Sequence, residues 1–159
     1  MQPTSVESFV VANGLSHHVL MWDGRAPADT RPTVVLLHGW LDMAWSFEAL
    51  GSALAAAGRR AVAFDFRGFG ETQWVPSGGY YHFPDYVLDL DSLLPLLAPG
   101  ETAVDLFAHS MGGTVAMLFA GARPQRVRRL VLAEALGPPD MAPEILVDRT
   151  VSFIDGVAR

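Results

Sequence analysis

The fold of this chain is decided by the stretch Leu106-Phe107-Ala108-His109-Ser110-Met111-Gly112-Gly113. An apolar run that starts at Val104 leads into Ser110, and the residues after Gly113 have a helical composition. A strand that turns sharply into a helix at a serine is a nucleophile elbow, which places the hydroxyl near the positive end of the helix. Ala108 takes the place of the first glycine of the G-x-S-x-G pattern, and Gly112 keeps the second. The stretch predicts a nucleophilic Ser110; the alternative is a buried strand followed by a glycine-rich helix start without chemistry.

Length and composition limit the classes of protein to consider. The 159 residues, of which 50% are hydrophobic, are enough for one domain with a sizeable core. A net charge of −6 argues against a nucleic-acid partner, and the lack of cysteine excludes disulfides and thiolate metal sites. The N-terminus does not resemble a signal peptide, and no window approaches the roughly 18 consecutive apolar residues of a membrane span. We therefore expect a cytoplasmic protein without a membrane span.

Buried strands alternate with helices along the chain. The continuous apolar run over residues 33–37 is typical of a parallel strand covered on both faces. Further strands are predicted at 60–65, at 104–108 and at 127–133, the last interrupted by Arg128 and Arg129. Helical periodicity is found over 45–57 and 83–97, where Pro95 is expected to kink or end the helix, and 141–159 resembles a helix that begins without being completed. An Asn13-Gly14 pair predicts a hairpin between 8–12 and 15–22. The alternation indicates an α/β fold with a mostly parallel sheet.

Metal and nucleotide cofactors are not indicated by the sequence. His17 and His18 fall on opposite faces of a strand without a metal-spaced partner, so we interpret both as structural or surface residues. No glycine-rich phosphate loop follows a first strand. The irregular stretch 73–82 carries Trp74, Tyr80 and Tyr81, aromatic residues that either line a binding cleft or pack under the loop.

Three motifs follow three of the predicted parallel strands: His38-Gly39-Trp40, Asp65-Phe66-Arg67-Gly68-Phe69-Gly70, and residues 108–113. Each lies at the carboxyl end of its strand, where open α/β sheets place their sites. The ordered set resembles the α/β-hydrolase superfamily, and residues 38–47 with Leu136-Gly137-Pro138-Pro139 are most similar to serine-hydrolase-like proteins.

The resemblance begins near Phe9 and covers only the N-terminal part of that fold. It implies a three-layer α/β-hydrolase fold with helices on both faces of the sheet, truncated after about the sixth strand. Residues 1–136 would form the N-terminal part of the core, and residues 137–159 the start of an incomplete cap region.

The chemistry that the resemblance implies is acyl transfer on a small-molecule, ester-type substrate. Ser110 would attack the carbonyl carbon, and the backbone N–H groups of Trp40 and Met111 would bind the oxyanion. Glu134, at the end of the next strand, is the one candidate for the triad acid inside the chain; the alternative is a solvated carboxylate where the strand emerges. Related dehalogenases and epoxide hydrolases place Asp at the nucleophile position, so a serine favours esters.

The other polar residues of the motifs receive supporting roles. By the resemblance, His38 braces the oxyanion loop, Asp65 and Arg67 hold the loop after their strand, and His109 packs away from the hydroxyl. The triad histidine of the family follows the acid in the sequence, but this chain has no histidine after His109. His82 could approach the cleft from its loop, but we do not assign it as the base.

Two observations predict that this chain needs a further part. The base is absent, and residues 129–133 would form an uncovered parallel edge strand, which favours aggregation. A missing C-terminal part could supply the histidine, and without it we expect the chain to be inactive. The alternatives are a non-catalytic binding module, one half of a split protein, or another reaction of the fold such as carbon–carbon bond hydrolysis or acyl transfer to a non-water acceptor.

Overall fold

The sheet defines the architecture of the protein. The structure, a computed structural model, describes residues 4–26, 29–135 and 143–157. Within them six strands form one sheet in the order β1-β2-β4-β3-β5-β6, in which β2 runs antiparallel to its neighbours and β4, β3, β5 and β6 are parallel. The strands are β1 (Val6–Ala12), β2 (Leu15–Asp23), β3 (Val34–Leu37), β4 (Arg60–Phe64), β5 (Val104–His109) and β6 (Val127–Ala133). The predicted α/β fold is confirmed.

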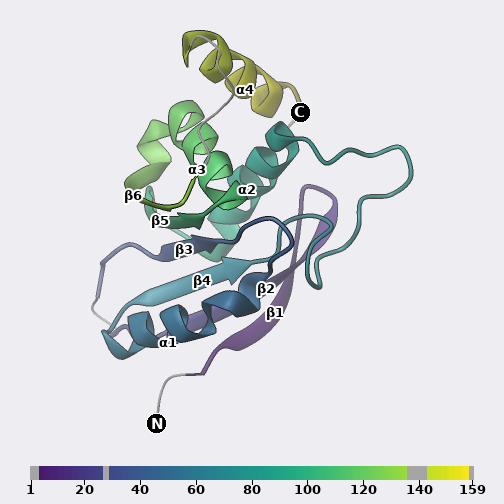
Figure 1. Cartoon of the computed structure of the whole chain (residues 1–159). Coiled ribbons are helices and arrows are strands. Elements are labelled where there is room, and N and C mark those ends of the chain that lie inside the picture. The colour runs from purple at the N-terminus through teal and green to yellow at the C-terminus, as the bar shows by residue number, and fades with distance from the viewer. Residues whose placement is uncertain (1–3, 27–28, 136–142, 158–159) are drawn as a thin grey trace.

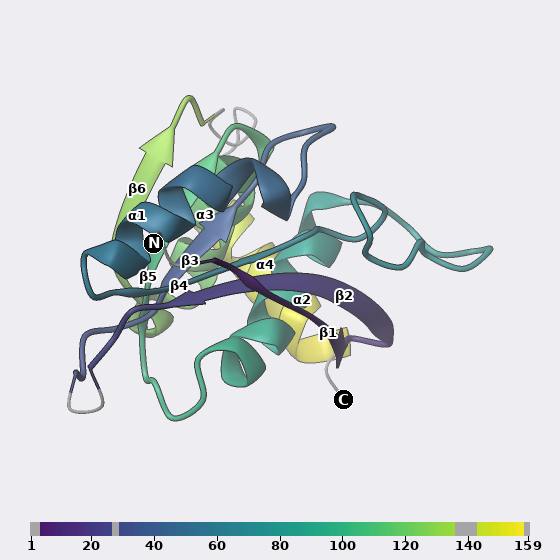
Figure 2. The same cartoon turned by 90° about the horizontal axis from the view of Figure 1, so that it is seen from below.

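Helices cover both faces of the sheet (Figures 1 and 2). On one face lies α1 (Glu48–Ala56), preceded by the short helix η1 (Ala44–Phe47), and on the other lie α2 (Phe83–Leu97) and α3 (Met111–Ala122). Between α3 and β6 runs the short helix η2 (Pro124–Arg126). Of the helices in the described residues, none is both long enough and apolar enough to cross a lipid bilayer.

A further helix, α4 (Pro143–Val157), packs on α2 and α3, where its Thr150 and Ile154 are buried. The helical prediction for residues 141–159 is thus confirmed over 143–157, and one face of this helix is buried on the core helices. The predicted boundary between residues 136 and 137 lies outside the described residues and stays a prediction.

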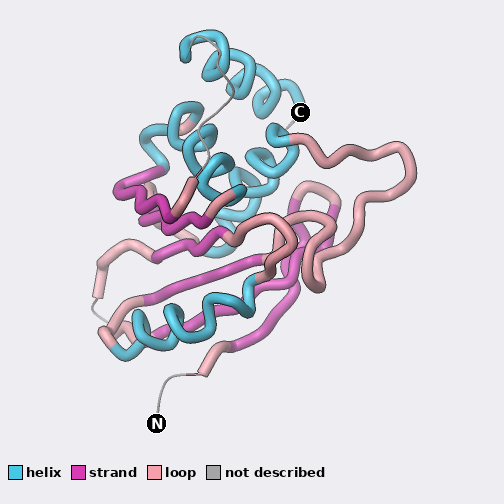
Figure 3. Tube along the Cα trace, in the orientation of Figure 1, coloured by secondary structure: helices cyan, strands magenta, loops and turns pink. Residues whose placement is uncertain are grey.

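Local signals explain most element ends. Asn13 and Gly14 both have positive φ, 48° and 73°, which is the backbone of a type I′ turn, so the predicted hairpin is confirmed. Pro95 lies inside α2, and the helix ends two residues later at Leu97. The loop between β4 and α2 extends away from the body of the molecule (Figure 3).

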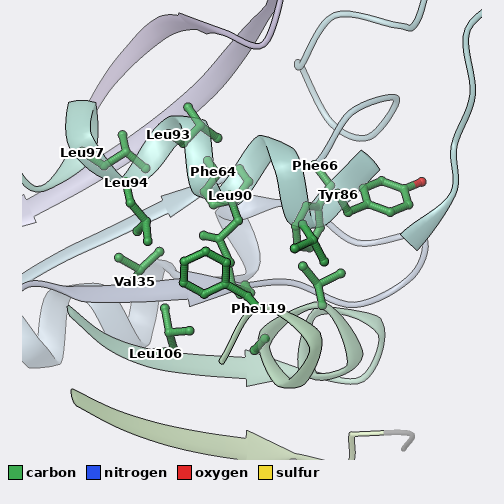
Figure 4. Close-up of a cluster of buried hydrophobic side chains, with 14 of the residues drawn as sticks. Val35, Phe64, Phe66, Tyr86, Leu90, Leu93, Leu94, Leu97, Leu106 and Phe119 are labelled. Carbon is green, nitrogen blue, oxygen red and sulfur yellow. The ribbon is translucent and has the colours of Figure 1, made fainter. Parts of the chain in front are cut away.

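The main core lies between the sheet and the pair α2 and α3 (Figure 4). The buried leucines of α2 recur at positions 90, 93, 94 and 97, one face of the helix, and meet Phe64, Leu106 and Phe119. Each such side chain contributes about 1.5–3 kcal/mol when it is fully buried. This packing fixes the carboxyl ends of β3 and β5, which carry the candidate site.

The sheet ends at β6, which is the outer strand in the described part of the chain. Val131 and Leu132 on this strand are 54% and 41% exposed. Beside them lies an apolar groove of about 210 Å³. Its lining residues are Val34, Leu36, Leu50, Leu54, Asp105, Leu106, Phe107, Arg129 and Val131. The predicted uncovered edge strand is therefore observed in the described chain.

Candidate active site

Ser110 stands at the turn between β5 and α3. Its backbone has φ 50° and ψ −115°, a left-handed conformation that costs a residue with a side chain about 1–3 kcal/mol. The N–H of Ser110 donates to the carbonyl of Ala133 at 3.0 Å, which fixes the turn against the end of β6. Ser110 is half-buried and lies at the N-terminus of α3. The strand, turn and helix predicted around the serine are all present.

Gly112 explains why a small residue is needed two positions after the serine. A Cβ at Gly112 would lie 2.6 Å from the carbonyl oxygens of both Leu37 and His38. The N–H of Gly112 donates to the carbonyl of His38 at 3.1 Å. The start of α3 is therefore joined to the loop after β3, the loop that carries Trp40.

His38 is a brace between two loops. Its Nδ1–H donates to the carbonyl of Gly39 at 2.7 Å, and its Nε2 accepts the N–H of Phe66 at 3.0 Å. These two bonds define a neutral tautomer, and burial lowers the pKa of His38, which keeps the ring neutral. Because both ring nitrogens are occupied, His38 braces the loop, as predicted, and is unable to act as a base.

The motif after β4 is held by buried charges. The carboxylate of Asp65, which is fully buried, accepts hydrogen bonds from the N–H groups of Ala44 and Glu71. Arg67 forms a two-pronged pair with Asp89, with donor–acceptor distances of 2.6 and 2.7 Å. The predicted structural roles of Asp65 and Arg67 are confirmed.

His17 and His18 are both fully buried, so a surface location is excluded for each. The pKa of His17 is lowered by burial, against the opposing effect of the nearby Asp89. The Nδ1 of His18 lies 2.8 Å from Asp65. This contact with a carboxylate from a distant part of the chain makes the burial of His18 compatible with its polarity, whereas the Nε2 of His17 lies 4.0 Å from Asp89 and has no hydrogen-bond partner among the described residues.

The backbone N–H groups of Met111 and Trp40 are the two predicted donors to the oxyanion. Met111 follows Ser110 in the sequence, and Trp40 lines the same cavity as Ser110. Met111 is the first residue of α3, so its N–H has no intrahelical acceptor. Within the described residues, neither the N–H of Met111 nor that of Trp40 donates to another group of the protein.

A cavity of about 260 Å³ opens beside Ser110. Its lining residues are Trp40, Tyr81, Phe83, Tyr86, Ser110, Met111 and Thr114. Of the three loop aromatics noted in the sequence, only Tyr81 lines this cavity. Phe83 and Tyr86, one turn apart at the start of α2, were missed, although their spacing places both on one helix face. Burial raises the pKa of Tyr86 to about 12, so its phenol is a neutral hydrogen-bond donor at pH 7.

Glu134 follows β6 directly and lies beside the elbow, because Ala133 pairs with His109 in the sheet. Its backbone turns sharply, with φ 51°, and its side chain is exposed. Within the described residues Glu134 forms no ion pair or hydrogen bond through its carboxylate.

No histidine of the described chain hydrogen-bonds to the hydroxyl of Ser110. The ring of His109 lies against Gly39, whose Cβ would be 3.0 Å from Nδ1. The side chain of His82 is 69% exposed and lies 3.5 Å from the carboxylate of Asp85. The described chain therefore offers the serine no base.

The comparisons with known proteins agree with this geometry. The family model described as alpha/beta hydrolase fold matches residues 32–155. The chain is 37% identical over 111 residues to a serine hydrolase-like protein of Danio rerio, covering 70% of this chain and 33% of that protein. It is 38% identical over 121 residues to the sn-1-specific diacylglycerol lipase ABHD11 of Mus musculus, covering 76% of this chain and 36% of the lipase.

Among solved structures, epoxide hydrolase I of potato (Solanum tuberosum) superimposes with a TM-score of 0.73 at 31% identity, covering 80% of this chain and 39% of the enzyme. The chain thus spans between 33% and 36% of the length of the two curated relatives above.

Proposed function

Since the chain belongs to the α/β-hydrolase fold family, we propose that it carries the nucleophile and oxyanion-binding half of a serine hydrolase that acts on carboxylic ester-type substrates. The observation that supports this most directly is the strained backbone of Ser110 beside the amides of Trp40 and Met111, which donate to no other group among the described residues. The similar proteins named as a serine hydrolase-like protein and a lipase support the same class of reaction.

In the proposed reaction, the Oγ of Ser110 attacks the carbonyl carbon of the ester. The carbonyl oxygen becomes an oxyanion, which accepts hydrogen bonds from the N–H groups of Trp40 and Met111. Each such donor lowers the barrier by about 2.7–4 kcal/mol. When the oxyanion collapses, the bond to the leaving alkoxide breaks, the alcohol departs with the serine proton, and the acyl-enzyme is later hydrolysed by water.

The proton transfers need an acid–base pair. We propose Glu134 as the triad acid, because it lies directly beside the elbow at the end of β6. A histidine from outside this chain would take the serine proton, since no histidine of the described chain hydrogen-bonds to Ser110 and three of them, His17, His18 and His38, are buried in other surroundings. Without a base the serine hydroxyl is a weak nucleophile, so we expect this chain alone to turn over esters poorly.

The chemistry of serine favours esters over epoxides, although the potato enzyme is named for epoxide hydrolysis. If a serine opened an epoxide, the product would be an ether, which water does not cleave under mild conditions. An acyl group on the same oxygen is an ester, which water does cleave. The aromatic walls formed by Trp40, Phe83 and Tyr86 fit an acyl group with an apolar body.

Chemical rescue tests this proposal on the chain as it is. The protein is incubated with a p-nitrophenyl ester with and without imidazole, and acylation is followed by mass spectrometry. We expect imidazole to accelerate acylation at Ser110 by at least tenfold, and Ser110→Ala to abolish it. Ser46→Ala, which removes an exposed serine elsewhere, is the matched control and should behave as the wild type. If Ser110→Ala is acylated as fast as the wild type, Ser110 is not the nucleophile.

The lack of a base near Ser110 also favours a second candidate, a non-catalytic module that binds an acyl-containing ligand. The same experiment separates the two. Acylation that imidazole accelerates supports the hydrolase. Saturable binding of the ester without any Ser110 adduct supports the binding module.

A further inference from the structure

A second group of ionisable side chains lies outside the Ser110 site, where the hairpin of β1 and β2 meets the loop after β4 (Figure 2). It comprises Glu7 on β1, His18 on β2 and Glu71 in the loop. One side-chain ligand atom of each lies within 4.8 Å of those of the other two. His18 is fully buried, whereas both glutamates reach the surface.

The imidazole of His18 is held in one orientation by a carboxylate behind it. Its Nδ1 lies 2.8 Å from Oδ2 of the buried Asp65, and that oxygen also accepts the N–H of Glu71. With the Nδ1 hydrogen donated to Asp65, the other nitrogen, Nε2, faces Glu7 at 3.1 Å. A carboxylate that orients a histidine in this way is the usual second layer of a protein metal site.

The charge around His18 is not balanced by arginine. Three carboxylates surround this single imidazole: Glu7, Asp65 and Glu71. In the described chain, none of them lies within ion-pair distance of an arginine. Elsewhere the protein does pair its enclosed carboxylates with guanidinium groups, as in Asp89 with Arg67. The excess negative charge at this cluster suits a divalent cation.

We propose that Glu7, His18 and Glu71 bind a divalent transition-metal ion, of which Zn²⁺ is the representative. An imidazole with carboxylates favours zinc over Mg²⁺ or Ca²⁺, which prefer oxygen ligands throughout. Two ligand atoms on a tetrahedral zinc are roughly 3.3 Å apart, given metal–ligand bonds of about 2.0–2.1 Å. The separation of 3.1 Å between His18 and Glu7 is close to this value. The exposed Glu71, with a carboxylate oxygen within 4.8 Å of the other two ligand atoms, would supply the third ligand, and water would complete the tetrahedron.

The bound ion would join the hairpin to the loop after β4. This loop carries Phe69, whose ring packs edge-on against Trp40 with centroids 5.2 Å apart. Trp40 lines the cavity beside Ser110. Binding of the ion would therefore rigidify one wall of that cavity without taking part in chemistry at the serine.

Calorimetric titration of the untagged, chelator-treated chain with ZnCl₂ tests the site. We expect one equivalent to bind, and Glu7→Gln and Glu71→Gln each to weaken binding at least tenfold, because each removes a ligand charge at the surface where folding is little affected. Glu144→Gln, an exposed glutamate on α4, is the matched control and should bind as the wild type. MgCl₂ should produce no saturable heat.

Circular dichroism of each variant checks that it is folded, and thermal unfolding gives a second measurement. Zn²⁺ should raise the unfolding temperature of the wild type and of Glu144→Gln but not that of Glu7→Gln or Glu71→Gln. The proposal is overturned if Zn²⁺ shows no saturable binding, or if Glu7→Gln and Glu71→Gln bind it with wild-type affinity. It is also overturned if His82→Gln, which removes an exposed histidine beside Asp85, abolishes binding.

Discussion

Replacing Gly112 by alanine should disrupt the elbow by an amount that the structure allows one to work out. The new Cβ would lie 2.6 Å from two carbonyl oxygens, those of Leu37 and His38, about 0.8 Å inside an ordinary contact. Both carbonyl oxygens belong to the backbone, so the overlap can be relieved only if the turn itself shifts. Overpacking of this kind costs about 1–3 kcal/mol, and stretching the Gly112 hydrogen bond to His38 adds about 0.5–1.5 kcal/mol.

Alanine gains about 1 kcal/mol over glycine in a helix, so the net loss for Gly112→Ala is about 0.5–3.5 kcal/mol. For a domain of this size, the unfolding temperature should fall by about 1–14 °C. Gly156→Ala in α4 is the matched control, because its Cβ meets no atom within 4 Å, and it should raise the unfolding temperature instead.

Thermal unfolding followed by circular dichroism measures both changes. In the rescue assay, acylation of Gly112→Ala by the ester with imidazole should fall about 10²-fold, since a displacement near 1 Å at the nucleophile has that effect. If the two alanine variants shift the unfolding temperature in the same direction, the contact argument is refuted.

Three further predictions follow from buried and edge residues. Arg67→Met should lower the free energy of unfolding by about 3–5 kcal/mol in urea titration, because it removes the guanidinium partner of the buried carboxylate of Asp89; an unchanged midpoint would contradict this. Burial lowers the pKa of His38 and of His17, so the unfolded chain binds more protons than the folded chain below about pH 6.5. Stability should therefore fall as the pH drops from 6.5 to 5.5, with a slope of up to about 1.4 kcal/mol per pH unit for each histidine, and His38→Gln should show a shallower slope. Val131→Lys on the outer strand should reduce self-association of the chain in sedimentation velocity, and equal association of variant and wild type would exclude that edge as its cause.

The sheet could be predicted from the sequence because its signals are local. The continuous apolar run at 34–37 identifies a buried parallel strand whatever lies elsewhere in the chain, and the interrupted run 127–133 identifies a strand that proves to be the exposed outer one. The helix after the elbow was predicted to begin near Thr114 but begins at Met111, since Gly112 and Gly113 resemble a turn in the sequence. The small size of Gly112 is needed for the close approach of the helix to the loop after β3, and that of Gly113 for its approach to Ala135 after β6, and neither serves a turn.

The walls of the site and the surroundings of His18 could not be predicted in the same way. His18 gave no sign of its partners, because Glu7 comes from β1 and both Asp65 and Glu71 come from the loop after β4, and only the folded sheet brings these segments together. A buried imidazole is indistinguishable from an exposed one until those partners are located. The same holds for Tyr86, which reads as an ordinary core residue of α2 and lines the cavity through its position in the first turns of that helix.

The register of the sheet explains why this chain places the nucleophile and the acid candidate next to each other but places no base beside them. Leu37 pairs with Ala108 and His109 pairs with Ala133, so the residues that follow these three strand ends meet at one edge. The serine and its neighbours occupy that edge by strand order alone. A base must instead come from a segment that lies over the carboxyl ends of the strands and can present an imidazole to the hydroxyl. His38 does not do so, because two hydrogen bonds hold its ring among the strand ends. If imidazole in solution accelerates acylation of Ser110, the nucleophile and the amide donors are correctly placed and only the proton acceptor is missing. If it does not, the amide donors or the nucleophile are misplaced as well.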